Sequence, residues 1–562
     1  MVLKDILYVC KKIIQTVRYY ESHYKKISFC SLHSIPHRAS GSTCRLSAKG
    51  QLPHNDDYTV RVREPNGEWL DLFEYKVDVD MDHVQQASMA QFDMSGPVEV
   101  MVRKNNGSIN DVCIRPRRHQ IAYTQNGNVI TFMLKEPQYL SIEFNGDRLH
   151  NLHLFANPTE KETYTESNDS VMYFGPGIHR PDDLPNNQIR IPSNTTVYLA
   201  PGAVVQAKLL IDKSENVRIL GRGILDHPIR GIEVTDSKNI LIDGITVINP
   251  DHYSIFGGGS TGLVIKNFKT FSCKGWSDGI DLMCCRNVDI SNVFLRNSDD
   301  CIALYNHRWN WWGGSSDITI KNAVLWADIA HPINMGGHGD PESTEGEILE
   351  NVHVSYIDIL EHDEDDRNYQ GCMSIDCGDK NIVRHVTFDH IWVDDFQEGR
   401  LFNLHILFNP KYNKAPGGRI EDITFSHINY NGVGANPSVI CGYDEEHAIK
   451  NIRFKNVTIN KKRLSSLIHR RNNHTAYRHF CHTALRRNTS TQAKTDKNKT
   501  GHYHATGQDN RMDARLPPGH VYPLGTLFWS RTGRMAYGKS GHFTRKIQGT
   551  GLSTVRRPLF YG

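Results

Sequence analysis

Short strands separated by turns recur along about half of the chain. Nine turn residues mark this repeat, each between two apolar-polar-apolar strands: Gly221, Gly244, Asn267, Asn292, Asn322, Asn351, His385, Asp422 and Asn451. Successive turns lie 23 to 37 residues apart, and an all-strand period in this range is typical of a solenoid or a propeller. Propeller blades are longer, and the absence of helical periodicity excludes leucine-rich and α/β repeats. We therefore predict an all-β fold in which residues 169–460 form a right-handed parallel β-helix of about nine or ten coils.

A different strand pattern precedes the repeat. Residues 57–62 and 98–102 alternate polar and apolar side chains, and turns containing Asn and Gly follow at 64–67 and 105–107. Strands of this length joined by such turns favour an antiparallel β-sandwich. We predict a small β-sandwich over residues 51–168, and we favour a packing and capping role for it over carbohydrate binding.

Charge divides the chain into three parts. Residues 1–50 hold nine Lys and Arg against two Asp and Glu, and residues 461–562 hold 20 against three. The segment between them carries a net charge of −21, although the whole chain carries +3. Neither flank shows the pattern of a packed element, so we expect both to be disordered. A basic tail could bind nucleic acid or an anionic surface, but we favour a non-native extension and expect function to require no nucleic acid.

Several classes of protein are disfavoured by what the sequence lacks. No apolar run is long enough for a transmembrane helix, and no signal peptide is visible. The 12 cysteines form no CxxC pair and no repeated Cys/His spacing, so we expect neither a zinc site nor a disulfide framework. Cys284, Cys285 and Cys301 fall within repeat strands and are expected in the core. We expect a monomer that contacts no membrane and needs no metal or cofactor.

Three carboxylates lie about one coil apart in the middle of the repeat. Asp278 sits in a Ser-Asp-Gly turn, and Asp299 and Asp300 follow 21 and 22 residues later. A separation of one coil would place all three on the same surface of a β-helix. Carboxylates that close raise one another's pKa, which acid–base hydrolysis of a glycosidic bond requires. The alternative is that they are ordinary turn residues, because Asp-Gly and Asp-Asp are common in turns.

These motifs resemble those of the polygalacturonase family, which carries Asn-Thr-Asp, then Asp-Asp one coil later, then Gly-His-Gly and Arg-Ile-Lys. Residues 276–278 read Trp-Ser-Asp, and residues 299–300 match the second motif. His331 falls in the place expected for the histidine, and His338, within Gly-His-Gly, ranks second because it comes seven residues late. The fourth motif is missing, and the equivalent coil reads Met-Ser-Ile at residues 373–375. The two-domain plan also resembles the dextranase group.

The resemblance implies roles for these residues. Asp299 would protonate the glycosidic oxygen, and Asp278 and Asp300 would orient and deprotonate the attacking water, which inverts the anomeric configuration. His331 would help to fix the protonation state of this group. Adjacent residues of a regular strand point to opposite faces, so Asp299 and Asp300 must lie at a bend to act together. The resemblance also implies a polysaccharide or oligosaccharide substrate and a secreted or periplasmic protein.

An insertion at residues 305–316 is expected to bind the substrate. Three of the eight tryptophans lie in it among polar residues, where a core would not place them: Trp309, Trp311 and Trp312. Exposed aromatic faces stack on sugar rings, and an exposed apolar cluster generally marks a binding site. Arg308 in this insertion and Arg400 on a later coil are the candidate cations for the substrate.

Two other functions remain open. A parallel β-helix can be a polysaccharide lyase, and Asp299 and Asp300 could then hold Ca²⁺, but no basic residue recurs beside them at coil spacing. It can also be a non-catalytic glycan-binding protein, in which case the carboxylate spacing is a coincidence. The acidic residues 361–366 could bind a cation, but we favour a solvated loop. Because Arg-Ile-Lys is missing and the core is acidic, we expect a neutral sugar at the cleaved bond, or at most a pectic chain mixed with neutral sugars.

Overall fold

The computed structural model describes residues 44–46, 52–168, 170–181 and 185–464. The two basic flanks lie almost wholly outside these residues, so their predicted disorder stays a prediction. No helix among the described residues is long and apolar enough to cross a membrane.

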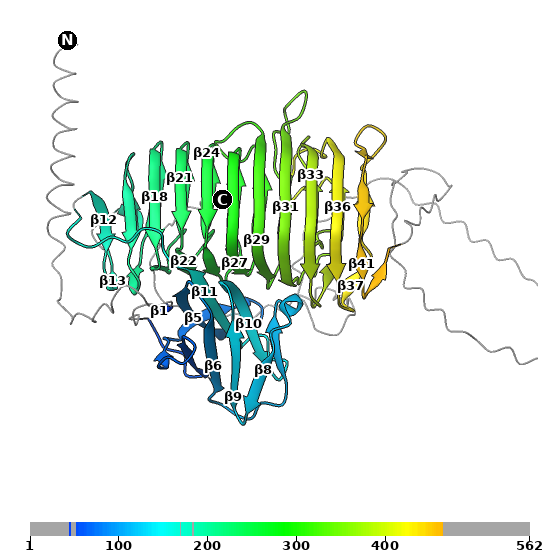
Figure 1. Ribbon diagram of the computed structural model, residues 1–562. Coiled ribbons are helices and arrows are strands. Elements are labelled where there is room, and N and C mark those ends of the chain that lie inside the picture. The colour runs from blue at the N-terminus through cyan, green and yellow to red at the C-terminus, as the bar shows by residue number, and fades with distance from the viewer. Residues whose placement is uncertain (1–43, 47–51, 169, 182–184, 465–562) are drawn as a thin grey trace, which may run out of the picture. The chain divides into compact units, whose positions relative to one another are not determined.

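The first part of the described chain is a two-sheet β-sandwich (Figure 1, blue to cyan). Its six-stranded sheet comprises β1 (Cys44–Leu46), β5 (Gln85–Met94), β11 (Leu152–Pro158), β10 (Gln138–Phe144) and β7 (Val112–Arg115), with β4 (Tyr75–Val79) paired to β5. Its five-stranded sheet comprises β3 (Leu70–Asp71), β2 (Tyr58–Arg63), β6 (Val98–Lys104), β9 (Val129–Leu134) and β8 (Tyr123–Asn126). All pairs are antiparallel except β11 with β5. A short 3₁₀ turn, η1 (Arg117–His119), follows β7.

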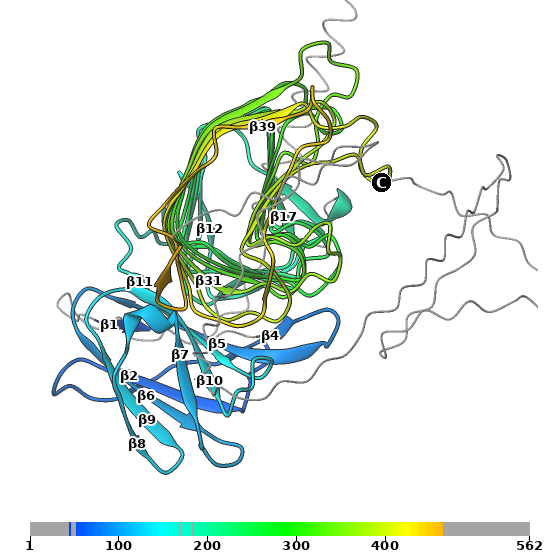
Figure 2. The ribbon, with the colours of Figure 1, turned by 90° about the vertical axis from the view of Figure 1, so that its right-hand side faces the viewer.

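The second part is a right-handed parallel β-helix, which confirms the predicted fold class (Figures 1 and 2). One of its sheets has ten strands, one per coil, in chain order: β14 (Gln188–Arg190), β17 (Lys208–Asp212), β20 (Ile232–Thr235), β23 (Ile255–Gly258), β26 (Ile280–Met283), β28 (Ile302–Tyr305), β30 (Ile333–Met335), β32 (Met373–Cys377), β35 (Phe402–Ile406) and β38 (Val439–Cys441). Ten coils in the described chain agree with the predicted nine or ten. The predicted domain limits, 51–168 and 169–460, stay predictions.

The other large sheet wraps around two bends of every coil. Its 19 strands are β12 (Val171–Phe174), β13 (Gly177–His179), β15 (Thr196–Leu199), β16 (Ala203–Val205), β18 (Glu215–Gly221), β19 (Ile224–Asp226), β21 (Lys238–Asp243), β22 (Thr246–Ile248), β24 (Thr261–Lys266), β25 (Lys269–Phe271), β27 (Arg286–Asn297), β29 (Ser315–Ala327), β31 (Ile348–Glu361), β33 (Ile382–Val393), β36 (Arg419–Tyr430), β39 (Ile449–Lys450), β40 (Arg453–Lys455), β41 (Thr458–Ile459) and β42 (Lys462–Arg463). The pair β34 (Gly399–Arg400) and β37 (Ala435–Asn436) and the 3₁₀ turn η2 (Pro185–Asn187) complete the elements.

Each bend carries a residue with a left-handed backbone, a conformation that Asn tolerates better than most side chains. On β27 the two bends are Asn287, with φ 53°, and Asn292, also with φ 53°. The side chains at the first bend form a ladder between coils, in which Asn351 Nδ2 donates to Asp317 Oδ1 over 3.1 Å. From Asn292 to Asp422, the turns that mark the repeat in the sequence are therefore bends inside continuous strands, whereas Gly244, Asn267 and Asn451 lie between two separate strands.

The alignment of the turns was wrong at one step. Asn322 lies at the second bend and stacks on Tyr356, whereas Asn351 lies at the first bend and stacks on Asp317. The sequence pattern slipped from one bend to the other because both bends carry a left-handed residue between apolar-polar-apolar segments. The fold class does not depend on this step, since either series repeats once per coil.

The core of the β-helix is a continuous stack of apolar side chains. On β27, Val288, Ile290, Val293 and Leu295 face inward and align with equivalent side chains of β29. The three cysteines expected in the core, Cys284, Cys285 and Cys301, are buried as predicted.

The sandwich packs on the β-helix through apolar side chains and buried ion pairs. Phe155 of β11 contacts Phe271 and Phe294 of the β-helix, with ring centroids 6.0 and 4.9 Å apart. Arg222 of the β-helix donates to Asp93 of β5 over 2.8 Å, and both side chains are buried. This is the packing role predicted for the sandwich.

Arg296 lies at the centre of this contact and is fully buried. Its guanidinium donates to Asp328 at 3.0 Å and, across to the sandwich, to Asn151 Oδ1 at 2.9 Å. It also lies over the Trp326 ring, 4.3 Å from the centroid. Every charge at this position is therefore paired or hydrogen-bonded, which a buried ion pair requires.

Replacing Arg296 by Ala should destabilise the protein by about 3–5 kcal/mol, because the buried Asp328 carboxylate loses its counter-charge. Urea unfolding followed by fluorescence measures the loss. The control is Arg218→Ala, since Arg218 pairs with Glu162 at the surface and exposed pairs contribute only about 0–1 kcal/mol. Equal effects of the two substitutions would contradict the assigned importance of the buried pair.

Candidate active site

The coil-to-coil register stacks three of the predicted residues. Ile280, Ile302 and Ile333 are partners in successive strands of the ten-stranded sheet. Asp278, Asp300 and His331 each lie two residues before these partners, so they occupy equivalent positions. The backbone confirms this, because Gly279 N donates to Asp300 O at 2.9 Å and Cys301 N donates to His331 O at 2.8 Å.

Asp299 joins this stack because the chain bends between β27 and β28. Its Oδ2 accepts the backbone N–H of Trp276 at 2.8 Å, and its Oδ1 accepts that of Asp300 at 3.0 Å. One carboxylate oxygen from each of Asp278, Asp299 and Asp300 lies within 4.8 Å of the others. The sequence analysis predicted that Asp299 and Asp300 must lie at a bend to act together, and the structure has a bend at these residues.

Asp300 is the carboxylate that the surroundings keep ionised. Its Oδ1 accepts the backbone N–H and the Nδ1 of His331, at 3.0 and 2.7 Å, and its Oδ2 accepts Asn334 Nδ2 at 3.1 Å. Burial alone would raise its pKa, but the charge and hydrogen bonds of His331 lower it below the ordinary value. Asp299 differs, since burial and the nearby Asp300 raise its pKa to about 6.

A fourth carboxyl group, Asp281 on β26, was missed by the sequence analysis. It is fully buried beside Asp278, and neither of its oxygens has a hydrogen-bond partner among the described residues. Arg308 lies 4.0 Å away. Burial raises the pKa of Asp278 well above its ordinary value, and Asp281, Asp299 and Asp300 add to this. Four carboxyls so close must share protons, which is the condition for acid–base chemistry.

His331 lies between two carboxylates, and the second, Asp376 of β32, was also missed. The Nε2 of His331 contacts the backbone oxygen of Tyr369 and lies 3.6 Å from Asp376 Oδ2. Burial would lower the pKa of His331, but Asp300 and Asp376 raise it to about 10. The imidazole is therefore a buried cation that balances the acidic cluster.

His338, the second-ranked histidine, makes no hydrogen bond or ion pair with a carboxylate among the described residues. Its ring packs edge-on against Tyr305 at 4.8 Å, and the Tyr305 hydroxyl lies 3.5 Å from Asp300. Burial lowers the pKa of His338 well below the ordinary value, so it is neutral. The ranking of His331 before His338 agrees with this geometry.

The tryptophans of the 305–316 insertion divide into two groups. Trp309 and Trp312 are 41% and 65% exposed, as expected for sugar-binding side chains. Trp311 is different, because it packs edge-on against Phe256 at 5.2 Å and over Gly258. Trp311 is therefore only half-exposed, since a glycine pair leaves room for its ring against the sheet, and its predicted contact with the substrate stays a prediction.

The two candidate arginines are held by the protein itself. Arg308 donates to the Tyr253 hydroxyl at 3.1 Å and lies over the Trp309 ring, 4.6 Å from its centroid. Arg400 lies two coils beyond His331, at the position in its coil that Asp278, Asp300 and His331 occupy in theirs. It contacts the backbone oxygen of Arg367.

The acidic run at 361–366 is only partly the predicted solvated loop. Glu361 and His362 are buried, and Glu361 pairs with Arg148 of the sandwich. A charge run looks solvated in the sequence, but here its first residues end strand β31 beneath the sandwich.

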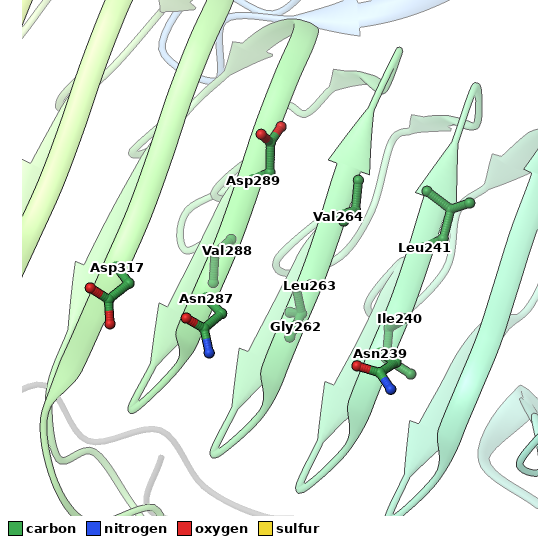
Figure 3. A pocket seen from close by; sticks show the side chains of 10 residues that line it. All are labelled: Asn239, Ile240, Leu241, Gly262, Leu263, Val264, Asn287, Val288, Asp289 and Asp317. Atoms are coloured by element: carbon green, nitrogen blue, oxygen red, sulfur yellow. The ribbon is translucent and has the colours of Figure 1, made fainter.

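A separate hollow lies on the outer face of the 19-stranded sheet, on β21, β24, β27 and β29 (Figure 3). Gly262 lies between Asn239 and Asn287 at the first bend of neighbouring coils. Leu241 and Val264 form the apolar part of the hollow. Its lining contains none of the clustered carboxylates described above.

Comparisons with known proteins show what the chain is similar to. Residues 200–477 match the family described as glycosyl hydrolases family 28. A polygalacturonase of Juniperus ashei is 23% identical over 204 residues, 35% of this chain and 36% of that protein. A probable endopolygalacturonase D of Neosartorya fischeri is 22% identical over 248 residues, 43% of this chain and 46% of that protein. The chain thus spans less than half the length of these relatives.

Two solved structures are similar to this chain. Dex49A from Penicillium minioluteum has a TM-score of 0.45 and 15% identity, covering 74% of this chain and 96% of its own. The family 28 exopolygalacturonase of Yersinia enterocolitica has a TM-score of 0.39 and 12% identity, covering 64% and 89%. Over residues 200–477, the chain is therefore similar in sequence to glycosyl hydrolases family 28.

Proposed function

We propose that the protein hydrolyses O-glycosidic bonds of a polysaccharide, with Asp299 as general acid and Asp300 as general base. The observation that carries this is the opposite shift of the two neighbouring pKa values, up to about 6 for Asp299 and down for Asp300. Pairs of carboxyls held in opposite protonation states mark the acid and the base of a glycosidase. Asp278, whose pKa is raised, orients the attacking water with Asp300.

His331 keeps this division in place. It donates two hydrogen bonds to one oxygen of Asp300, and its positive charge favours the ionised form of that carboxyl. Asp376 on the other side of the ring holds the charge on His331. The histidine is thus a positioning residue for the base.

The sugar at the cleaved bond is neutral in this proposal. The coil that corresponds to Arg-Ile-Lys in polygalacturonases presents Ser374 and Asp376, which bond to each other at 2.9 Å. At that position a galacturonate carboxylate would meet the buried Asp376 carboxyl, whose pKa burial raises to about 7, and no Arg or Lys of residues 371–377. Arg308 is already engaged by Tyr253 and lies near Asp281.

Inversion of the anomeric configuration belongs to this proposal, and one observation favours the alternative. Inverting carboxyl pairs typically lie roughly 6.5–9.5 Å apart and retaining pairs roughly 5–5.5 Å apart, whereas the three carboxylates here approach within 4.8 Å. A retaining reaction through a covalent intermediate is therefore the second candidate. Proton NMR of the first-formed anomer decides between them: the inverted anomer is expected, and the retained anomer would replace the proposed mechanism.

Asp299→Asn should lower kcat by about 10²–10⁴-fold, because it removes the proton donor at nearly constant volume. Reducing-sugar release measures kcat, and thermal unfolding should show an unchanged Tm. Asp289→Asn is the control, since Asp289 pairs with Lys321 on the outer face. A variant that keeps most of its activity would show that the acid is misassigned.

Activity should fall as the pH rises through about 6, because Asp299 must be protonated to donate and its pKa is about 6. At low pH, activity should fall only below the ordinary carboxyl pKa of about 3.9, because Asp300 must be ionised and its pKa is lowered. The measurement is kcat/KM against pH, which reports the free enzyme. A profile that rises through pH 6 would reverse the two roles.

The neutral-sugar proposal predicts a higher kcat/KM on dextran-type or other neutral glycans than on polygalacturonate. The comparison is made at several salt concentrations, because the acidic field that repels a polyanion is screened over about 8 Å at physiological strength. Polygalacturonate as clearly the best substrate, with Arg308→Ala or Arg400→Ala removing the preference, would restore a plain polygalacturonase.

A further inference from the structure

We propose that Trp276 and the β4–β5 turn of the sandwich (residues 80–84) together form a sugar-binding subsite next to Asp299. The inference deepens the proposed function and rests on it, since it places a neutral sugar ring beside the acid. The residues come from two parts of the chain that are about 200 positions apart, so their contact could not be predicted from the sequence.

Trp276 is the first component. Its side chain is 52% exposed although it lies beside a buried carboxylate cluster. Its backbone N–H donates to Asp299 Oδ2 at 2.8 Å, so the residue that carries the ring also holds the Asp299 carboxyl in place. In the polygalacturonase pattern this position is Asn, which offers no flat apolar face.

The backbone of Trp276 is strained, with φ 63°. A bulky residue rarely adopts this conformation, and such strain persists where the surroundings impose it, commonly at functional sites. Here the turn is held by Ser277, whose backbone oxygen accepts Ser272 Oγ at 2.5 Å and whose Oγ accepts Lys274 N at 3.2 Å. The turn thus fixes both the Trp276 ring and the hydrogen bond to Asp299.

The sandwich supplies the second component. Met81 N donates to the hydroxyl of Ser298, the residue before Asp299, at 3.0 Å. Asp80 N donates to Asp328 Oδ2 at 3.2 Å, which anchors the start of the turn. The sulfur of Met81 lies 4.0 Å from where a side chain on Gly275 would begin. The turn therefore reaches the segment that carries Trp276.

The surface of this region suits the apolar face of a sugar ring. Met81 and Val84 of the turn are 38% and 57% exposed. The Tyr412 ring lies edge-on to Trp276, with ring centroids 6.3 Å apart. Exposed apolar side chains are common singly, but here two of them, Trp276 and Met81, belong to residues whose backbone N–H groups bond to Asp299 and to its neighbour Ser298. An aromatic face with a polar edge binds the C–H face of a pyranose and leaves its hydroxyls in water.

Binding is measured in the Asp299→Asn background, by calorimetric titration with isomaltohexaose, galactohexaose and hexagalacturonate. The parent should bind at least one neutral hexasaccharide more tightly than hexagalacturonate. Adding Trp276→Ala should weaken that binding about tenfold or more, whereas Trp276→Phe, which keeps a flat ring, should restore most of it. Adding Met81→Ala should weaken it about two- to fivefold.

Two matched controls separate the subsite from general surface effects. Met133→Ala removes another exposed methionine of the sandwich, on β9, and Tyr356→Ala removes an exposed aromatic ring at a bend of β31. Both should bind like the parent. Trp276→Ala binding like the parent, or a parent that binds no neutral hexasaccharide, overturns the subsite, and Met81→Ala behaving like Met133→Ala overturns the contribution of the sandwich.

Failure of the subsite proposal can be distinguished from failure of the proposed reaction. If Asp299→Asn retains activity, the acid is misassigned, but the same substitutions in the native chain still test the subsite through initial rates. Trp276→Ala should then raise KM by about tenfold and change kcat less, because the backbone donor to Asp299 remains. An unchanged KM overturns the subsite under either assignment of the acid.

Discussion

The hydrogen bonds between successive coils are the constraint on which the rest of this structure depends. They place equivalent residues of neighbouring coils in direct contact, as Gly279 N and Asp300 O show. Because the register continues through Ile302 and Ile333, a carboxylate, a second carboxylate and a histidine become neighbours without any loop having to fold over them. The site is therefore as rigid as the sheet that carries it, which favours fixed acid–base geometry.

The same stacking forces charges together in a buried place. The four aspartates, Asp278, Asp281, Asp299 and Asp300, cannot all be ionised there, so the cluster holds protons. The buried His331 cation favours Asp300 as the carboxyl that is deprotonated. The difference between neighbouring aspartates is thus produced by what each one contacts. Two backbone N–H groups face Asp299, whereas a charged ring faces Asp300.

The sandwich is part of this arrangement through its contacts with the β-helix. Arg296 joins Asp328 of the β-helix to Asn151 of the sandwich, and the β4–β5 turn contacts Ser298, the residue before Asp299. A buried ion pair adds little net stability but strongly disfavours any packing that leaves one charge alone. The contact therefore specifies one position of the sandwich against the active-site coil.

The sequence by itself determined the fold class, the approximate number of coils and the grouping of the three aspartates, because strand periodicity and one-coil spacing are local properties. It missed Asp281 and Asp376, and it did not show that the Trp311 ring packs against the sheet. These depend on which side chain of another coil or insertion lies opposite, and the irregular insertions between coils hide that register from the sequence. The contact of Met81 with the segment of Trp276 was decided by tertiary structure alone, since only packing brings two such distant segments together.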